Sequence, residues 1–266
     1  MLLDFNRLGA LRVVLSAIAL LVGAFLLLPI VVIVLLSFGS SRYLQFPPPA
    51  WTLRWYEELF DDPEWLTAFA TSFEIAVVVA VVATLLGLMA SFGLTRGRFR
   101  GKEALRALFL TPMVMPVVVL AVALYAFFLR LHLNGTFLGF VIAHTVIALP
   151  FAIISISNAL EGFDKSIEDA AVLCGASPIE AKLRVTLPAI KSGLFGAAIF
   201  SFLASWDEVV VAIFMSSPDL QTLPVRIFST LRQDFSPVIA AVSTVLVALT
   251  VVLMAVAALF RKGKRA

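Results

Sequence analysis

The sequence contains few charged residues for its length. Only 14% of its 266 residues are Asp, Glu, Lys or Arg, whereas soluble domains contain about 25%. Hydrophobic residues make up 61% of the chain, and its mean hydropathy is +1.05. Because the deficit of charge extends over the whole length, we expect one all-helical domain, residues 1–266, embedded in membrane lipid. The pI of about 9.2 does not indicate nucleic-acid binding, because membrane orientation dictates where Lys and Arg lie.

Residue types used for metal, redox or hydrolytic chemistry are also scarce. One cysteine, Cys174, excludes an internal disulfide and a thiolate metal cluster. The two histidines, His132 and His144, are too few and too dispersed for a metal centre. No phosphate-binding loop is present, since residues 97–103 have the wrong spacing and end in an acid. No metalloprotease or nucleophile-elbow motif occurs either. We therefore expect a chain that is not an enzyme and holds no metal or cofactor.

Long uncharged segments predict transmembrane helices. A bilayer core about 30 Å thick needs about 20 apolar residues at 1.5 Å each, and backbone groups in hydrocarbon must bond within their own segment. The first run, Val13–Ser41, is longer than the apolar core of a signal peptide, so it is expected to be retained. The predicted helices cover residues 12–38, 70–95, 105–130, 137–159, 190–216 and 236–260.

Proline and small residues within the spans predict a bend and close helix packing. Pro112 and Pro116 predict a bend in the third helix, because proline removes a backbone donor; the bend could be a packing irregularity or part of a pathway wall. Gly87, Ala90 and Gly93 are expected to allow close helix packing.

The distribution of Lys and Arg predicts the orientation. Six crossings put both termini on one side, and fifteen of the twenty basic residues lie in the segments of that side. Since cytoplasmic loops are enriched in Lys and Arg, both termini are expected in the cytoplasm.

The first outer segment is rich in aromatic residues. It contains Trp51, Trp55, Tyr56 and Trp65, and a helix lying on the surface is predicted near Leu53–Phe60. An interfacial anchor is the simpler interpretation; a docking surface for an external partner is the alternative.

The loop between the fourth and fifth helices predicts a small helical hairpin. Ser166–Leu173 is expected to be helical, Gly175 to supply a turn, and Ser177 with Glu180 to form a capping box. Residues 186–188, Thr-Leu-Pro, are expected to break the second helix. An apolar stripe that could dock into a groove comprises Ile167, Ala170, Ala171 and Cys174.

This loop resembles the signature loop of the membrane subunits of binding-protein-dependent ABC importers. The family pattern is Glu-Ala-Ala, three residues, Gly, nine residues, Ile-x-Leu-Pro, and the spacing here matches it throughout. Asp169 replaces the Glu and Val185 replaces the Ile, and both keep the chemical type. The other matching residues are Ala170, Ala171, Gly175, Leu187 and Pro188.

The resemblance implies a type I permease fold with six transmembrane helices and a coupling helix between helices 4 and 5. The loop residues, Leu187 and Pro188 included, would contact an ATPase subunit. A second permease, two ATPases that bind ATP and Mg, and a periplasmic substrate-binding protein would complete an importer in the bacterial inner membrane. Residues 205–210 and 222–225 look most like permeases of polyamine importers, which implies a small cationic substrate.

Three carboxylates are predicted within the spans. A charge near the bilayer centre costs about 2.5–3.5 kcal/mol, so it usually faces a cavity or a partner. Glu74, Asp207 and Glu208 are all expected in the outer half. Glu208 would share a polar, lumen-facing stripe with Ser201 and Ser205, and Asp207 would pair across a helix interface. The cluster would attract a cation; structural pairing or protonation of these acids is the alternative.

Other functions stay open at this point. An ABC permease could carry an opine, an amino-acid derivative or a phosphonate instead. A secondary transporter or channel would work without ATPases, and a membrane-embedded enzyme has no motif in its support.

Overall fold

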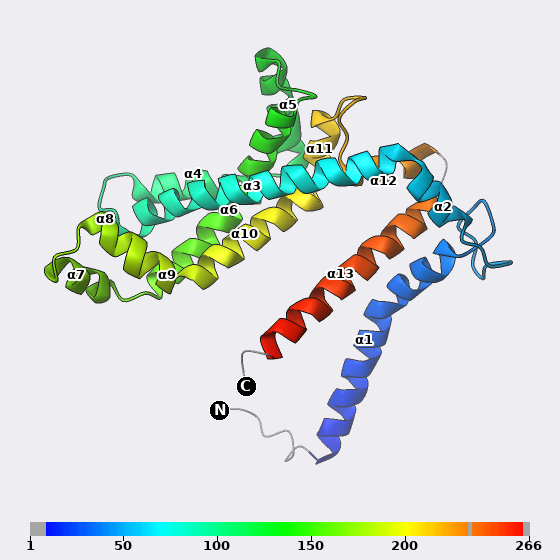
Figure 1. The fold of residues 1–266 in the computed structure, drawn as a ribbon, viewed down its shortest axis with the longest axis horizontal. Coiled ribbons are helices and arrows are strands. Elements are labelled where there is room, and N and C mark those ends of the chain that lie inside the picture. The colour runs from blue at the N-terminus through cyan, green and yellow to red at the C-terminus, as the bar shows by residue number, and fades with distance from the viewer. Residues whose placement is uncertain (1–8, 234–235, 263–266) are drawn as a thin grey trace. The chain divides into compact units, whose positions relative to one another are not determined.

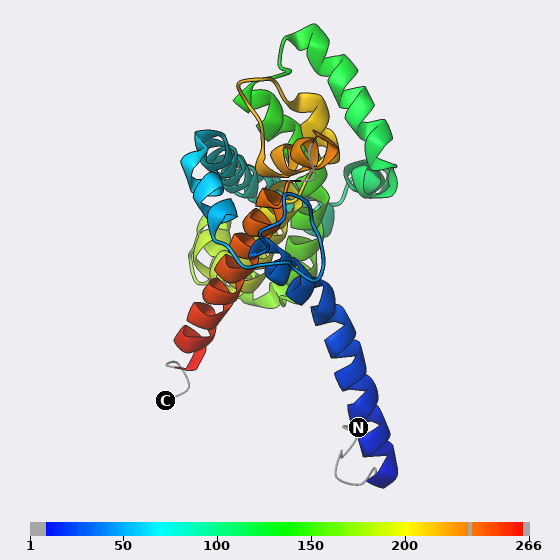
Figure 2. The same ribbon diagram turned by 90° about the vertical axis from the view of Figure 1, so that its right-hand side faces the viewer.

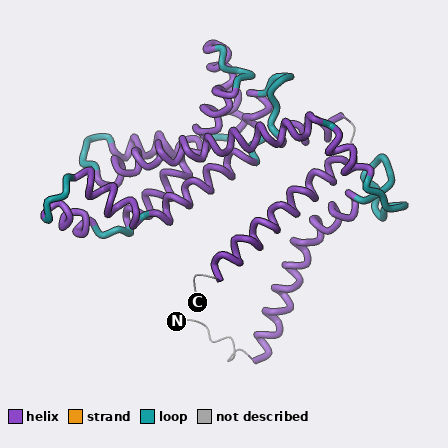
Figure 3. Tube along the Cα trace, viewed as in Figure 1, coloured by secondary structure: helices purple, strands orange, loops and turns teal. Residues whose placement is uncertain are grey.

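The computed structural model describes residues 9–233 and 236–262, and within these ranges it is helical apart from loops and two isolated bridge pairs (Figures 1 and 3). The all-α expectation is confirmed. The elements are α1 (Gly9–Ser37), α2 (Arg54–Asp61), α3 (Pro63–Arg96), α4 (Lys102–Val114), α5 (Val117–Leu131), α6 (Phe137–Glu161), α7 (Lys165–Leu173), α8 (Pro178–Ala181), the π-helical turn η2 (Lys182–Thr186), α9 (Leu187–Ala189), α10 (Lys191–Trp206), α11 (Val210–Met215), α12 (Leu223–Gln233) and α13 (Val238–Lys262).

The predicted spans 12–38, 70–95 and 137–159 overlap three long helices of the structure. Three helices, α1, α3 and α6, are each long and apolar enough to cross a membrane. Two helix pairs with a bend, α4–α5 and Pro178–Ala189 with α10, are apolar enough when each pair is taken together, as a broken span or a re-entrant loop. The sixth predicted span corresponds to α13, whose apolar stretch is described as far as Val252. Three basic residues used for the orientation lie outside the described residues, namely Arg7, Lys264 and Arg265.

The predicted bend at the third span is confirmed and is large. The axes of α4 and α5 differ by 104°, and Figure 2 shows α4 nearly end-on where α5 is seen along its length. Pro116 lacks a backbone N–H, and the residue before a proline is driven out of the helical region. Met115 accordingly adopts φ −71° and ψ 142°. The bend therefore falls at Met115-Pro116, whereas Pro112 lies inside α4.

The expectation of one continuous fifth helix over 190–216 is wrong. The helix stops at Trp206, and α11 begins at Val210. The side chain of Glu208 accepts a hydrogen bond from the backbone N–H of Val211 at 2.8 Å. A carboxylate that binds a nearby N–H favours the start of a new helix over continuation of the old one.

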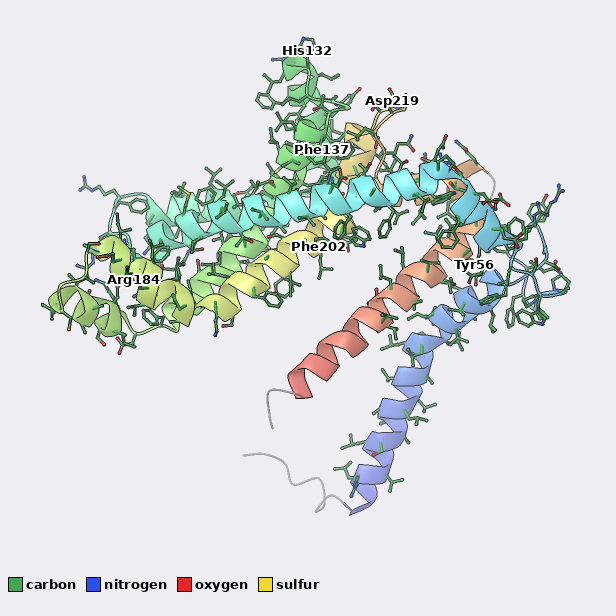
Figure 4. The ribbon with its side chains drawn as sticks, in the orientation of Figure 1. Tyr56, His132, Phe137, Arg184, Phe202 and Asp219 are labelled. Carbon is green, nitrogen blue, oxygen red and sulfur yellow. The ribbon has the colours of Figure 1, made fainter. Side chains whose placement is uncertain are left out.

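Two compact units make up the chain, and the first contains the residues up to Pro63 and from Ser229 onward. Within it α13 packs against both α1 and α2. The helix expected near Leu53–Phe60 is present as α2, and its tryptophan packs inside the unit. Trp55 is buried and donates from Nε1 to the carbonyl of Gly39 at 2.6 Å. Its neighbour Tyr56, labelled in Figure 4, shares a hydrogen bond with Ser37 at 2.7 Å. These bonds attach α2 to the end of α1.

The second unit, Glu64–Phe228, is built around α6. This helix packs along α10, and Ser155 donates to the carbonyl of Gly193 at 2.9 Å. Gly193 faces Ala159 so closely that a Cβ at the glycine would overlap the alanine methyl group. α6 also meets α3, where a Cβ at Gly87 would lie 2.7 Å from that of Ala152. Small residues therefore set the distance of both neighbours from α6.

Gly93 does not take part in this packing, contrary to expectation. A Cβ at Gly93 would meet nothing within 4 Å, and the residue is exposed. Helical phase explains the difference, because Gly87 and Gly93 are six residues apart and point to different faces of α3.

Leucine substitutions at these two glycines test the packing. Gly87→Leu should force α3 away from α6 and cost about 1–3 kcal/mol, the usual range for overpacking. Gly93→Leu makes the same chemical change on an exposed face, where it meets no neighbour and removes a glycine from the helix interior, so stability should stay unchanged or rise by up to about 1 kcal/mol. Thermal unfolding of the detergent-solubilised protein would measure both. Equal unfolding temperatures for the two variants would contradict the packing described here.

Candidate functional site

The helical hairpin formed by residues 161–190, here named the α7–α8 hairpin, has the local structure that the sequence predicts. Gly175 adopts φ +100°, a left-handed conformation that suits glycine. Ser177 and Glu180 form a reciprocal capping box with bonds of 3.0 and 3.2 Å. Asp164 caps α7 by accepting from the N–H of Ser166. Local hydrogen bonds thus determine where both helices begin.

These caps lower the pKa values of the two capping carboxyl groups. Hydrogen bonds from Ser177 lower the pKa of Glu180, and those from Ser166, aided by the charge of Arg96, lower the pKa of Asp164. A lowered pKa means that each cap stabilises the hairpin above the ordinary carboxyl pKa and that this contribution is lost as the pH falls through the lowered value. Both caps are therefore present at neutral pH.

A buried hydrogen bond closes the base of the hairpin. Thr186 in η2 donates to the carboxylate of Glu168 in α7 at 2.7 Å. Both residues are buried, with exposed fractions of 0% and 8%. Sequence reasoning missed this bond, because it singled out the adjacent Asp169, and a step of one residue turns a helical side chain by about 100°.

The tip of the hairpin exposes apolar side chains. Leu173 is 89% exposed and Ile179 is 69% exposed. Asp169 and Ala170 are exposed, Ala171 is half-buried, and Asp169 has an ion pair with Lys165 at 3.8 Å. The surface expected to dock on a partner is thus accessible in this chain.

The second arm of the hairpin does not break where proline was expected to break it. Leu187 is half-buried and Pro188 exposed, and the chain runs through η2 and α9 without interruption. In η2 the N–H of Leu187 bonds to the carbonyl of Lys182, which widens the helix by one residue. The turn falls later, at Ile190, where the path bends by 72° into α10. Figure 4 labels Arg184 on this arm.

The break between α10 and α11 places the predicted acids differently from expectation. Asp207 is exposed at the C-cap of α10, not paired at a helix interface. Glu208 is half-buried. Ser201 and Ser205 are buried, and Ser205 shares a hydrogen bond of 2.9 Å with Nδ1 of His144 in α6. The predicted stripe of Glu208, Ser201 and Ser205 therefore does not form, because the helix ends before Glu208.

Four aromatic rings from α3 and α10 pack together near these acids in the sequence and were not anticipated. Phe202 stacks on Trp206 at 5.7 Å between ring centroids. Phe69 and Phe73 of α3 meet these two rings edge-on, at 5.5 and 6.0 Å. We name Phe69, Phe73, Phe202 and Trp206 the aromatic cluster; Figure 4 labels Phe202.

The aromatic cluster connects two of the predicted acids. Glu74 directly follows Phe73 and is exposed on α3, and Asp207 directly follows Trp206. The cluster thus brings the chain segments that carry these acids together. Aromatic rings and carboxylates are the two kinds of group that attract an organic cation. The sequence signal that could have revealed the cluster is the spacing of four residues between Phe69 and Phe73, and between Phe202 and Trp206, which places each pair on one helix face.

Comparison with known proteins identifies the chain. Residues 83–265 match the family described as the binding-protein-dependent transport system inner membrane component. The chain belongs to this family. Its members are membrane permease components of ABC importers, so the expectations of a permease subunit, of a multi-pass inner membrane protein and of a chain that does not itself hydrolyse ATP are confirmed.

Curated relatives of this permease cover almost its whole length. It is 32% identical to the spermidine/putrescine transport system permease protein PotC of Haemophilus influenzae, over 93% of this chain and 96% of the relative. It is 33% identical to the putrescine transport system permease protein PotI of Escherichia coli, over 91% of this chain and 88% of the relative.

A solved structure has the same fold as this permease. A bacterial ABC transporter involved in the import of the acidic polysaccharide alginate superposes with a TM-score of 0.72, covering 97% of both chains at 14% identity. The type I permease fold is thereby confirmed.

Substitution of Thr186 tests the closure of the hairpin in this permease. Thr186→Val keeps the shape and removes the donor to Glu168. A hydrogen bond to a charged group is worth about 1.5–3 kcal/mol, so amide hydrogen exchange in 165–186 should become faster by about tenfold or more. Asp169→Asn alters the neighbouring, exposed carboxylate and should leave the exchange unchanged. Equal exchange in wild type and Thr186→Val would show that the bond does not hold the hairpin closed.

Proposed function

We propose that this permease subunit imports polyamines, as one half of a transmembrane heterodimer whose α7–α8 hairpins are gripped by two ATPase subunits. A periplasmic substrate-binding protein would deliver the substrate to the outer face, and both termini would lie in the cytoplasm. ATP and Mg would be bound by the ATPase subunits. The exposed apolar tip of the hairpin carries the proposal for the ATPases, and the acids beside the aromatic cluster carry it for the substrate.

The hairpin suits an ATPase partner because its base is closed by a buried hydrogen bond while its tip exposes apolar side chains. At the base, the bond between Thr186 and Glu168 is buried. At the tip, Leu173 and Ile179 are largely exposed. Exposed apolar residues near an accessible charge, here Asp169, are typical of a docking surface. The small residues Ala170 and Ala171 would permit close approach of the partner.

The path for the substrate would pass the break between α10 and α11. A polyamine carries ammonium groups separated by apolar methylene segments. Carboxylates attract the ammonium groups, and aromatic rings bind both the cation and the apolar segments. Glu208, Asp207 and Glu74 would supply the charge, and the aromatic cluster would supply the rings. The relatives named for spermidine and putrescine support this choice of solute.

Reversal of charge at Asp169 tests the ATPase partner. Asp169→Arg should release the ATPase subunit, because one approaching charge of the wrong sign costs several kcal/mol at an interface. The control Asp219→Arg makes the same change at an exposed residue of the loop before α12 (Figure 4) and should retain the ATPase. Co-purification after expression of the whole operon measures both.

Cys174 offers a second readout on the same hairpin. It is the single cysteine of the chain and is exposed. A membrane-impermeant maleimide should label it in inside-out vesicles but not in intact spheroplasts, and bound ATPase should slow the labelling. Labelling from the outside would refute the proposed orientation. Retention of the ATPase by Asp169→Arg would refute the docking surface.

Neutralisation of Glu208 tests the substrate. Glu208→Gln removes the charge but keeps an oxygen that can accept from the N–H of Val211, so α11 should still form. Uptake of labelled spermidine should fall by about tenfold to a hundredfold, as expected for loss of one charged hydrogen bond. Glu103→Gln, at an exposed acid of α4, should transport normally. Unchanged uptake by Glu208→Gln would remove this carboxylate from the path.

A further inference from the structure

Arg96 joins the last turn of α3 to the start of the α7–α8 hairpin. Its guanidinium group donates to the carbonyl of Leu160 at 3.1 Å and to the carbonyl of Phe163 at 3.0 Å. Leu160 lies in the last turn of α6, and Phe163 lies between α6 and α7. The last carbonyls of a helix lack partners within the helix and carry its negative dipole end, so a cation binds them well.

The same end of α3 also contacts the second arm of the hairpin. Nζ of Lys182, the first residue of η2, lies 5.7 Å from the ring centroid of Phe92. Phe92 precedes Arg96 by four residues, so both side chains project from one face of α3. The bond between Glu168 and Thr186 joins the two arms to each other. One helix end thus contacts both arms of a closed hairpin.

Further along, α3 and α6 are joined by buried polar contacts. Ser91 donates to the carbonyl of Ile153 at 3.1 Å and receives a hydrogen bond from Ser157 at 3.2 Å. Ser91 and Ser157 are both buried, and Gly87 packs on Ala152 one turn further. From Gly87 to Arg96, therefore, α3 is attached to α6 at successive turns.

The contacts of Arg96 and Phe92 connect α3 to the base of the hairpin. They are separate from the docking surface at its tip. Asp169, Leu173 and Ile179 are exposed at the tip, whereas Arg96 lies at the base. A partner that moves the tip moves the base with it, because the base is closed by a buried bond. Whether α3 follows depends on the contacts of Arg96 and Phe92.

We propose that Arg96 is a positioning residue for transport: it transmits the ATP-driven movement of the α7–α8 hairpin to α3, and so to the aromatic cluster and Glu74 on that helix. This inference rests on the proposed function. It assigns separate roles to the tip of the hairpin, which binds the ATPase, and to the base, which passes the movement on. A guanidinium group is suited to the role because a single terminal nitrogen, Nη2, donates to both carbonyls, and because its planar group is more weakly hydrated than the ammonium group of lysine.

The test compares Arg96→Gln, Arg96→Lys and Arg98→Gln in the complete complex. Arg98 is exposed two residues further along, so Arg98→Gln removes the same charge from the same segment and controls for effects on membrane orientation. Each complex, with its ATPases and binding protein, is reconstituted in vesicles, and spermidine uptake and ATP hydrolysis are measured together.

We expect all three variants to retain the ATPase subunit and to hydrolyse ATP. In Arg96→Gln the spermidine transported per ATP hydrolysed should fall by about tenfold or more, as loss of a charged hydrogen bond predicts. Arg96→Lys should be intermediate, and Arg98→Gln should match the wild type.

Two results would overturn the inference. A wild-type ratio of uptake to hydrolysis in Arg96→Gln would show that α3 moves without this contact. Loss of the assembled complex in Arg96→Gln, together with full transport by Arg96→Lys, would show a role confined to folding. Failure of the proposed function would look different, since the wild-type chain itself would then not bring down an ATPase subunit.

Discussion

Every peptide group that enters the hydrocarbon must find its hydrogen-bond partner within the protein, and the fold of this permease follows from how it meets that demand. In α1, α3 and α6 the helix itself supplies the partners over 25 residues or more. Where a helix stops, other groups must replace the missing bonds. The N–H of Val211 is bound by Glu208, and Pro116, which has no N–H, marks the turn between α4 and α5. The breaks therefore lie where particular side chains make them possible.

This requirement gives Glu208 two roles. As a cap it stabilises the start of α11, and as a carboxylate it supplies negative charge beside a helix break. Glu208 lies where the chain between α10 and α11 is not helical. In the proposed function a cation would meet this charge next to the aromatic cluster, so that one local departure from helical regularity would serve both the fold and the pathway.

The base and the tip of the α7–α8 hairpin differ in structure. Its base is closed by buried polar contacts and attached to α3 through Arg96, while its tip is exposed and apolar. In the proposed function, a rigid base would prevent the loss of movement through local deformation, because packed cores are not continuously deformable. An exposed tip allows the partner to bind and detach without disturbing the packing of α6 against α3 and α10. The closed base and the exposed tip depend on different residues, so substitutions can change one without the other.

The sequence by itself determined the class of protein, the approximate places of the helices, the caps of the hairpin and the family resemblance of residues 169–188. These features depend on composition and on neighbours a few residues apart, as with Ser177 and Glu180 or Met115 and Pro116. Only the tertiary structure decided which of two adjacent acids, Glu168 or Asp169, is buried, and which glycine of α3 meets another helix. It also decided that Ser205 faces His144 rather than Glu208, and that four rings from α3 and α10 come together. The physical reason is that helical phase and the choice of neighbour depend on contacts between residues far apart in the chain, such as Phe69 and Trp206, which no local pattern encodes.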